Sequence, residues 1–408
     1  MKLRYSILLC LLVSIGSANA LGQGAKQKSD LWIPAGLTEK EIAEGWIALF
    51  DGKTKYGWRA ESKVDWSVQE GSLSADTGEV GLLRTTSQFD NFVLRLEFQA
   101  AKGSNSGVFI RTPPRPTRPD GDCYEINIAP ADNPFPTGSI VARRKGVVIE
   151  ADDSRWHTME IVARGAGITV SIDGTQTVEY QCDNPLGRGY IGLQYNSGSI
   201  KFRKIRLKPL QLKSIFNGKD LSGWTTYPKM KSTFTVENEA LRVRNGSGQI
   251  ETKGQYADFI LQFRCRTNAP KLNSGVFFRC IPGKKMDGYE SQIQNGFKQD
   301  RTQPDDCGTG GIFRRKNARY INSDDQQWFS KTIVTTGPHF AVWVNGLQVS
   351  DWTDKRKKND NPRRGLRLKA GTIILQGHDP TTDLQFKEFF IREIDPRRPK
   401  RAQTDKQK

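Results

Sequence analysis

The chain is 408 residues long, more than one ordinary domain needs, and this length indicates two or three domains. Hydrophobic residues make up 36% of the sequence and charged residues 26%, while the mean hydropathy of −0.59 excludes a polytopic membrane protein. The formal net charge of +18 makes nucleic acid or another polyanion a partner to test. The 39 glycines, 19 prolines and 9 tryptophans favour turn-rich β structure with aromatic packing.

The first twenty residues have the pattern of a secretory signal. Lys2 and Arg4 precede an apolar stretch at residues 7–15, which ends in the small-residue sequence Ala18-Asn19-Ala20. We therefore expect residues 1–20 to be a cleaved signal peptide. An exported protein, in the periplasm or outside the cell, is the predicted product.

Residues 21–40 separate this signal from the first predicted domain. They are interpreted as a linker, and its last residues contain the start of a short helix. Thr38 and Glu41 have the spacing of a capping box, in which the threonine hydroxyl and the glutamate carboxylate satisfy free backbone N–H groups at a helix start.

The rest of the sequence contains two copies of one ordered set of motifs. WIALFDGKTKYGW at residues 46–58 recurs as KSIFNGKDLSGW at 213–224, and NSGVFIR at 105–111 recurs as NSGVFFR at 273–279. Further pairs in the same order are Tyr124-Glu125 and Tyr289-Glu290, Trp156 and Trp328, Asp173-Gly174 and Asn345-Gly346, and Leu193-Gln194 and Leu375-Gln376. The order predicts a tandem duplication. The predicted parts are one domain at 41–209, a second at 212–395, and a basic tail at 396–408.

Each repeat has the pattern of antiparallel β structure. Apolar and polar residues alternate along residues 92–99 and again along 259–266, as in strands with one buried face. Asp173-Gly174 and Asn345-Gly346 follow apolar strands and favour type I′ hairpin turns. About 170 residues of such strands per repeat fit a two-sheet sandwich. The predicted fold class is all-β, with two tandem jelly-roll β-sandwiches.

The ordered motifs also carry a family resemblance. The succession of FDG or FNG, GW, NSGVFxR, a Tyr-Glu strand, TG, a tryptophan, a hairpin and a final Leu-Gln strand resembles the 3-keto-disaccharide hydrolase family. The resemblance implies a concanavalin A-like lectin/glucanase jelly roll, of a kind found mostly in exported bacterial proteins that act on sugars. It also implies a structural divalent metal such as calcium, although the sequence has no His/Cys cluster at zinc spacing.

Strand periodicity places polar residues on shared faces in the second repeat. Glu290, Gln292 and Gln294 alternate with Tyr289, Ser291 and Ile293, and this polar row is unusual in a strand. In the strand at 273–279, one face is expected to carry Asn273, Phe277 and Arg279, with Gly275 leaving room for a ligand. Gln376 and His378 share a face in the last motif. If these faces line one concave sheet, they form a site that can bind a sugar and move a proton.

The chemistry implied by the family requires a base and a stabilised enolate. A ketone at C3 of a glycoside acidifies the C2 proton, so that a base can remove it and the C1 substituent can leave. Glu290 or His378 is the predicted base, and Arg279 or a bound metal would stabilise the oxyanion. Predicted substrate-binding residues are Asn273, Gln292, Gln294, Gln376, Glu125, Asn127, Arg111 and Gln194. Hydrolysis by two carboxylates is the alternative, although only one carboxylate in this region, Glu125 or Glu290, recurs in both repeats.

The two repeats are not equally equipped for this chemistry. His378 has Asn196 as its counterpart, and Gln292 has Asn127. We therefore predict that the second repeat holds the better site and that the first has drifted toward binding or structure. Solvated strand residues remain the alternative for Glu125 and Glu290.

Five cysteines lie outside the predicted signal, an odd number that forms neither a disulfide framework nor a zinc pattern. Cys265 and Cys280, in neighbouring predicted strands, are the pair that we would test first for a disulfide.

The positive charge is concentrated in two short segments. Residues 355–369 contain eight basic residues and one acidic residue, and residues 397–408 contain six and one. This distribution argues against a specific nucleic-acid partner and weakly favours attachment to an anionic envelope or an acidic glycan. The predicted function is an enzyme that acts on 3-keto-glycosides or related disaccharides. The alternatives are a non-catalytic, lectin-like carbohydrate-binding protein and a polyanion-binding protein.

Overall fold

The computed structural model describes residues 31–151 and 153–394. The predicted signal at 1–20, the first half of the predicted linker and the basic tail lie outside these ranges. Within them, no helix is long and apolar enough to cross a membrane.

One short helix precedes the first repeat. Helix α1 (Glu39–Ala43) begins after Thr38, whose hydroxyl accepts the backbone N–H of Glu41 at 3.2 Å, while the Glu41 carboxylate accepts the backbone N–H of Thr38 at 3.0 Å. This confirms the predicted capping box. Ile42 on this helix packs with Leu37 and Trp46 in a small apolar cluster.

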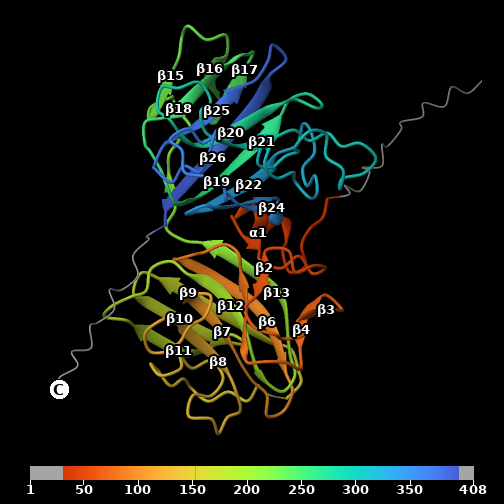
Figure 1. The fold of residues 1–408 in the computed structure, drawn as a ribbon, viewed down its shortest axis with the longest axis vertical. Coiled ribbons are helices and arrows are strands. Elements are labelled where there is room, and N and C mark those ends of the chain that lie inside the picture. Colours follow the sequence, from red (N-terminus) through yellow and green to blue (C-terminus); the bar gives the residue numbers. More distant parts are fainter. Residues whose placement is uncertain (1–30, 152, 395–408) are drawn as a thin grey trace, which may run out of the picture. The chain divides into compact units, whose positions relative to one another are not determined.

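The first repeat is a sandwich of two antiparallel sheets (Figure 1). The larger sheet has the order β11-β10-β9-β6-β13-β4-β3, with β1 also paired to β13, and the smaller has the order β2-β5-β12-β7-β8. The strands are β1 (Ile47–Ala48), β2 (Trp58–Ala60), β3 (Ser67–Gln69), β4 (Ser72–Ala75), β5 (Gly81–Thr85), β6 (Phe92–Ala100), β7 (Asn105–Thr112), β8 (Tyr124–Ile128), β9 (His157–Arg164), β10 (Gly167–Ile172), β11 (Thr175–Gln181), β12 (Tyr190–Ser197) and β13 (Ile200–Pro209).

The second repeat has the same arrangement, strand for strand (Figure 1). Its larger sheet has the order β16-β17-β26-β19-β22-β23-β24, with β14 paired to β26, and its smaller sheet has the order β15-β18-β25-β20-β21. The strands are β14 (Lys213–Ser214), β15 (Trp224–Thr226), β16 (Thr233–Glu237), β17 (Ala240–Arg244), β18 (Gly248–Thr252), β19 (Phe259–Thr267), β20 (Ser274–Cys280), β21 (Tyr289–Ile293), β22 (Phe329–Thr336), β23 (His339–Val344), β24 (Leu347–Thr353), β25 (Thr372–Gly377) and β26 (Asp383–Glu393). The predicted fold class, two tandem jelly-roll sandwiches, is confirmed.

The core of each sandwich lies between its two sheets and follows from strand alternation. In β6, buried and half-buried residues alternate along the whole strand, as predicted. Both hairpin turns are also as predicted, because Asp173 and Gly174 between β10 and β11, like Asn345 and Gly346 between β23 and β24, have positive φ angles.

The predicted disulfide between Cys265 and Cys280 is wrong, because all five cysteines among the described residues are free and buried. The physical reason is their placement in different layers. Cys265 lies on β19 of the larger sheet and faces the core, whereas Cys280 ends β20 of the smaller sheet and packs with Phe277 and Ile374.

Two equivalent aspartates join the repeats through ion pairs. Asp90 in the first repeat accepts hydrogen bonds from Arg392 on β26, with an Arg392 Nη2 to Asp90 Oδ2 distance of 2.9 Å. Asp258 in the second repeat accepts from Arg188 of the first repeat and from its own Arg279, the latter at 2.8 Å. Each repeat therefore donates one arginine to the aspartate of the other.

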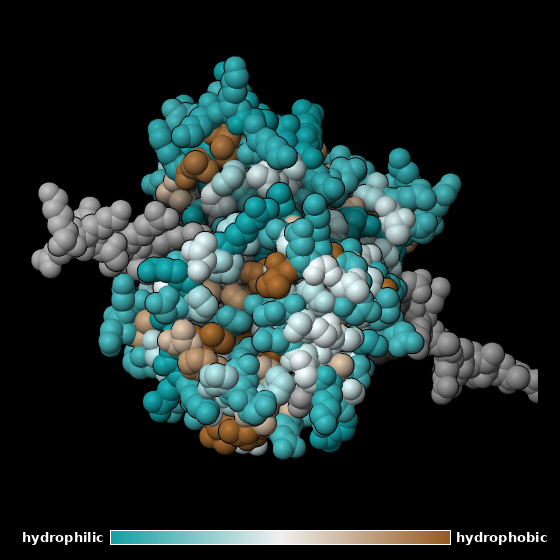
Figure 2. Space-filling model, turned by 60° about the horizontal axis from the view of Figure 1, so that its bottom comes forward, coloured by the Kyte–Doolittle hydropathy of each residue, from teal (hydrophilic) through white to brown (hydrophobic). Residues whose placement is uncertain are grey.

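The face in Figure 2 is mostly hydrophilic, and its apolar residues form small separate patches. Few large apolar side chains are exposed among the described residues. They are Ile33, Val80, Val147, Val148, Leu368 and Phe390.

Candidate active site

The five-stranded sheet of the first repeat carries two rows of side chains that run across its strands. The pairing register places Leu82, Gln194, Gly107 and Asn127 side by side in one row. The next row is Arg84, Gly192, Phe109 and Glu125. Adjacent strands lie about 4.8 Å apart, so neighbours within a row can contact one another.

The second repeat repeats both rows at equivalent positions. Its first row is Gln249, Gln376, Gly275 and Gln292, and its second is Glu251, Ile374, Phe277 and Glu290. The expectation that Glu290 and Gln292 share one face, opposite to Tyr289 and Ile293 in the core, agrees with this register.

The glycine in each first row makes room for a glutamate side chain. A Cβ atom at Gly275 would lie 2.6 Å from Oε1 of Glu290, and one at Gly107 would lie 3.4 Å from Oε1 of Glu125. The space beside Gly275, expected to receive a ligand, therefore holds the Glu290 carboxylate. The glutamates lean across the sheet surface toward the centre of each site.

The expectation that Arg279 shares a face with Phe277 is wrong. Arg279 has a positive φ of 49°, and the β20–β25 register shifts between Phe277 and Cys280, so a bulge interrupts the alternation. The Arg279 side chain is fully buried on the core side, where it donates to the Ala257 and Arg367 carbonyls and to Asp258. The structure does not bring it to Glu290.

Arg111 is held in the same way in the first repeat. It has a φ of 50° and donates to the carbonyls of Asp90, Gly165 and Leu186 and to the side chain of Asn91. Both arginines hold loops against the sandwich, and neither lines a cavity that contains a glutamate of the two rows.

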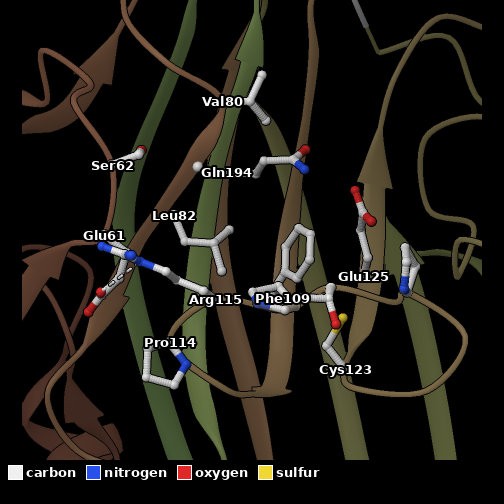
Figure 3. A pocket seen from close by; sticks show the side chains of 14 residues that line it. Glu61, Ser62, Val80, Leu82, Phe109, Pro114, Arg115, Cys123, Glu125 and Gln194 are labelled. Carbon is white, nitrogen blue, oxygen red and sulfur yellow. Dashed lines mark ion pairs between the residues drawn. The ribbon is translucent and has the colours of Figure 1, made fainter.

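A cavity of about 410 Å³ opens over the rows of the first repeat (Figure 3). Glu125, Gln194, Phe109, Leu82 and Cys123 line it, and Figure 3 shows Leu82, Phe109 and Gln194 lying between Glu61 on one side and Glu125 on the other. This volume is within the range of pockets that bind small ligands.

Glu125 is a buried carboxyl group without a cationic partner in this cavity. Its exposed fraction is 7%, and burial raises its pKa to about 7, while a hydrogen bond from the Gln194 side chain acts in the opposite direction. A carboxyl group with a pKa near neutrality can exchange protons with a substrate at physiological pH.

The opposite rim of this cavity carries a second carboxylate, Glu61, in a different environment. Its Oε1 lies 2.6 Å from Nη2 of Arg84, and its Oε2 lies 3.8 Å from Nε of Arg115, which is on a proline-rich segment. Nε of Arg59 also lies 3.6 Å from Oε1 of Glu61, so three guanidinium groups surround this carboxylate. The cavity thus combines a carboxyl group without a cationic partner, Glu125, with one that is bound by arginines, Glu61.

A smaller cavity, about 110 Å³, lies beside Glu290 in the second repeat, and it shares with the first cavity the equivalent lining positions of Cys123 and Glu125, which are Gly288 and Glu290. Glu290 lines it, and burial raises the Glu290 pKa to about 7 against the opposing positive charges of Arg363, His378 and Lys331. Arg363 covers the carboxylate, with Nη2 3.5 Å from Oε2 of Glu290, and its guanidinium lies 5.1 Å from the centre of the Phe277 ring.

A short loop also fills part of the second site. Gln249 accepts the backbone N–H of Met286 at 2.8 Å and donates to the carbonyl of Lys284 at 3.2 Å, so the loop at 281–288 is bound to the sheet. Gln376 lies against the same loop, with Nε2 3.2 Å from the Met286 sulfur. The first repeat has Leu82 in place of Gln249 and cannot hold its loop by these bonds.

The remaining predicted residues are distributed around the second site. Gln292 donates to Asn273 at 2.9 Å and to Asp306 at 3.3 Å, while Gln294 is buried next to this pair. His378 is exposed just beyond β25 and pairs with Asp379 at 2.7 Å, with no direct hydrogen bond to Glu290.

The five-stranded sheets of both repeats carry buried side-chain oxygens without hydrogen-bond partners. Among the described residues, these include Oε1 of Gln194 in the first repeat and Oε1 of Gln292, Gln294 and Gln376 in or beside the sheet of the second. In the first repeat, the side-chain amide of Asn127 donates a hydrogen bond to the backbone carbonyl of Phe135. The unpaired amide oxygens are acceptors that sugar hydroxyl groups could satisfy.

Sequence reasoning missed Lys331, which lies behind the Glu290 strand. Its exposed fraction is 1%, and its ammonium donates to the backbone carbonyls of Ser291 at 3.0 Å and Gln292 at 2.8 Å. Burial lowers its pKa to about 7. The equivalent residue in the first repeat is Met159, and Ser291 has Ile126 as its counterpart. Aligning the two repeats residue by residue would have shown this paired change.

The residues around Glu125 do not form a metal site. The nearest donors are the amide of Gln194 and the thiol of Cys123, and burial raises the Cys123 pKa to about 12, which keeps the thiol protonated. In the part of the chain that the structure describes, no three His, Cys, Asp or Glu side chains cluster as metal ligands. The calcium implied by the resemblance remains a prediction, and no step below is assigned to it.

A family model described as a 3-keto-alpha-glucoside-1,2-lyase-like domain matches residues 45–208 and again residues 211–392. The chain belongs to the 3-keto-alpha-glucoside-1,2-lyase-like family. Each repeat is one copy of this 3-keto-alpha-glucoside-1,2-lyase-like domain, and the resemblance drawn from the ordered motifs is confirmed. The family description names an enzyme, in accord with the predicted enzymatic function.

A curated relative, the 3-keto-disaccharide hydrolase of Bacteroides thetaiotaomicron, is 37% identical over 79 residues, which are 16% of this chain and 27% of the relative. The chain therefore spans about a quarter of the length of the curated relative that it matches. A protein from Parabacteroides distasonis provisionally assigned as a glycosyl hydrolase aligns with a TM-score of 0.39 and 18% identity, over 43% of this chain and 98% of its own. The carbohydrate-binding module CBM66 from Bacillus subtilis aligns with a TM-score of 0.30 and 12% identity, over 37% and 94%.

Proposed function

We propose that this chain is an exported enzyme that cleaves 3-keto-glycosides, with Glu125 in the cavity of the first repeat as the base. One observation carries the proposal. Glu125 is buried, has a raised pKa of about 7 and faces a cavity of about 410 Å³ that has room for a sugar. Family membership supplies the class of substrate. The signal predicted at 1–20 supports export, and cell fractionation would test it.

The proposed reaction is an elimination followed by hydration. The Glu125 carboxylate takes the C2 proton, and the C–H electron pair forms an enolate with the C3 ketone. The enolate then reforms the ketone as a C1–C2 double bond develops and the C1–O bond breaks, and the departing oxygen takes the proton that the Glu125 carboxyl group now carries. In a later step water adds across the double bond, with its hydroxyl group on C1 and a proton on C2.

The cavity supplies groups suited to each stage of this reaction. The apolar Leu82 and Phe109 exclude water beneath the sugar ring, which strengthens electrostatic interactions with the enolate. The Gln194 amide holds the Glu125 carboxyl group in place. A proton-transfer group with a pKa near the working pH typically contributes about 10²- to 10⁴-fold to the rate.

The arrangement of the two carboxylates disfavours direct hydrolysis. Glu61 follows β2 and Glu125 lies on β8, the two edge strands of a five-stranded sheet, so about 19 Å separates their backbones at the usual strand spacing. Glycosidases that use paired carboxylates hold the two carboxyl groups about 5 to 10 Å apart. Figure 3 shows the Glu61 carboxylate at the side of the cavity away from Glu125, where it pairs with Arg84 and Arg115. This arrangement favours a single base over a pair of acids.

The test compares Glu125→Gln with Glu290→Gln in the full chain, with 3-keto-glucosides as substrates. We expect Glu125→Gln to lower kcat by at least about 100-fold and Glu290→Gln to leave it within about threefold. The opposite result would assign the reaction to Glu290, as the sequence predicted. Sugar binding without turnover by the unaltered protein would instead favour the lectin-like alternative.

A further inference from the structure

The second repeat concentrates arginines around its small cavity. Arg314, Arg315 and Arg363 line the cavity of about 110 Å³ together with Glu290 and Phe313. The cavity is smaller than pockets that enclose whole small-molecule ligands, which begin at about 300 Å³. Its size fits one small group with the charge opposite to that of its lining.

Two of these arginines have no counterpart in the first repeat. Arg314 has Ala142 at the equivalent position, and both residues have a φ of 57° in the same tight turn. Arg363 comes from the segment at 354–371 between β24 and β25, which is ten residues longer than the equivalent segment at 182–189 between β11 and β12. The longer segment contains the basic run at 355–369, so the second repeat has gained positive charge at its site.

The acidic groups near the cavity do not balance this charge. Asp354 is paired with Arg356, whose guanidinium donates a hydrogen bond to each of the two carboxylate oxygens. Glu290 is the one carboxylate that lines the cavity, and it faces Arg363. Asp306 also acts on Glu290, but three arginines line the cavity against these two acidic groups, so the balance stays positive.

The guanidinium groups of Arg314 and Arg315 have N–H groups that donate to no carboxylate among the described residues. Among the described contacts, Arg315 donates to the backbone carbonyls of Arg314 and Arg363, at 3.2 and 2.9 Å. The Arg314 guanidinium is exposed and lies 5.2 Å from the centre of the Phe313 ring. Burial and the positive charges of Arg356 and Arg363 lower the pKa of Arg315, so these cations repel one another.

We propose that the cavity of the second repeat binds an anionic substituent of a glycan, a sulfate ester or a uronate carboxylate. Arginine donors in a fork arrangement bind such groups through paired, charge-assisted hydrogen bonds. The exposed lysines of 355–369 would extend the favourable field to the neighbouring units of an acidic chain. This inference goes beyond the proposed function and stands whichever glutamate is the base.

The test measures binding of three oligosaccharides of equal length to the full chain by calorimetry. One is sulfated, one contains uronate, and one is neutral, and none carries a 3-keto group, so turnover cannot interfere. We expect at least one acidic oligosaccharide to bind at least tenfold more tightly than the neutral one. The stronger of the two identifies the anion as sulfate or carboxylate. Equal affinities for all three would overturn the proposal.

Two variants and a matched control separate the cavity from diffuse charge. Arg314→Ala, which installs the first-repeat residue at an exposed position with the same backbone angle, and Arg363→Gln should each weaken acidic binding about tenfold or more. Lys355→Gln with Lys358→Gln removes two charges from the same segment outside the cavity and should change affinity less than about threefold. An equal loss in the lysine control would show that the attraction is diffuse, and the proposal would fail.

Discussion

The glutamates of the two repeats occupy the same place in the same sheet, yet their surroundings differ. Glu125 faces a cavity of about 410 Å³ with an apolar floor, whereas Glu290 lies under Arg363 in a cavity of about 110 Å³. Burial gives both carboxyl groups a pKa of about 7. The shared sheet therefore determines the acidity of the glutamate, and the loops above it determine what can reach it.

The largest expected effect concerns the buried lysine that distinguishes the repeats. Met159→Lys should lower the free energy of unfolding at pH 7 by about 5 kcal/mol if its pKa falls as far as that of Lys331, since a drop of about 3.5 units costs 1.36 kcal/mol per unit. Adding Ile126→Ser to Met159→Lys should recover part of this loss, because the double variant has the same two residues at these positions as the second repeat has at Ser291 and Lys331. Lys331→Met should change stability by about 1 kcal/mol or less. Urea unfolding at pH 7 measures all three variants.

The pH dependence of this effect has a defined sign. The pKa of Lys331 is lower in the folded protein, about 7, than its ordinary value of 10.5, so the unfolded state binds more protons between these values. Stability from this group therefore rises with pH from 7 to about 10.5, and Lys331→Met should remove that rise. A rise that persists in Lys331→Met would mean that the lysine is not the group that titrates.

The next effect concerns which glutamate acts as the base. A base with a pKa of about 7 is active when deprotonated, so kcat/KM should rise about 100-fold from pH 5 to a plateau above pH 7. Gln194→Leu should move the midpoint to higher pH, because the hydrogen bond to the Glu125 carboxylate is lost. Arg363→Gln should leave the midpoint in place. A midpoint that moves only with Arg363→Gln would transfer the role to Glu290.

The smallest effect concerns the glycines beneath the two carboxylates. Gly275→Ala should cost about 2 kcal/mol of unfolding free energy, because its Cβ would lie 2.6 Å from the Glu290 carboxylate and force it to move. Gly107→Ala, with 3.4 Å to the Glu125 carboxylate, should cost less than about 1 kcal/mol. Thermal unfolding of both variants measures the difference, and equal losses would contradict the closer packing of Glu290.

The fold could be predicted from the sequence because its signals are local. Alternation along β6, the turns at 173–174 and 345–346, and the capping box at Thr38 each depend on a few neighbouring residues. The polar face of Glu290 and Gln292 followed from the same periodicity.

The arrangement of the site could not be predicted to the same extent. A bulge at Arg279 reverses the alternation, and no residue pattern in that strand distinguishes it from a regular one. The size of each cavity depends on loops at 281–288 and 354–371, whose paths are set by contacts with distant residues such as Gln249 and Glu290. Periodicity contains no information on such contacts.

The ion pairs of Asp90 and Asp258 make the two repeats depend on each other, because each pair joins residues of both repeats. Each aspartate binds a guanidinium of the other half of the chain, Arg392 for Asp90 and Arg188 for Asp258, and Asp258 also binds its own Arg279. The first half expressed alone would leave Asp90 without Arg392 and Arg188 without Asp258. The two repeats are therefore expected to evolve together, because replacing Asp90 or Asp258 in one repeat leaves an arginine of the other repeat without its partner.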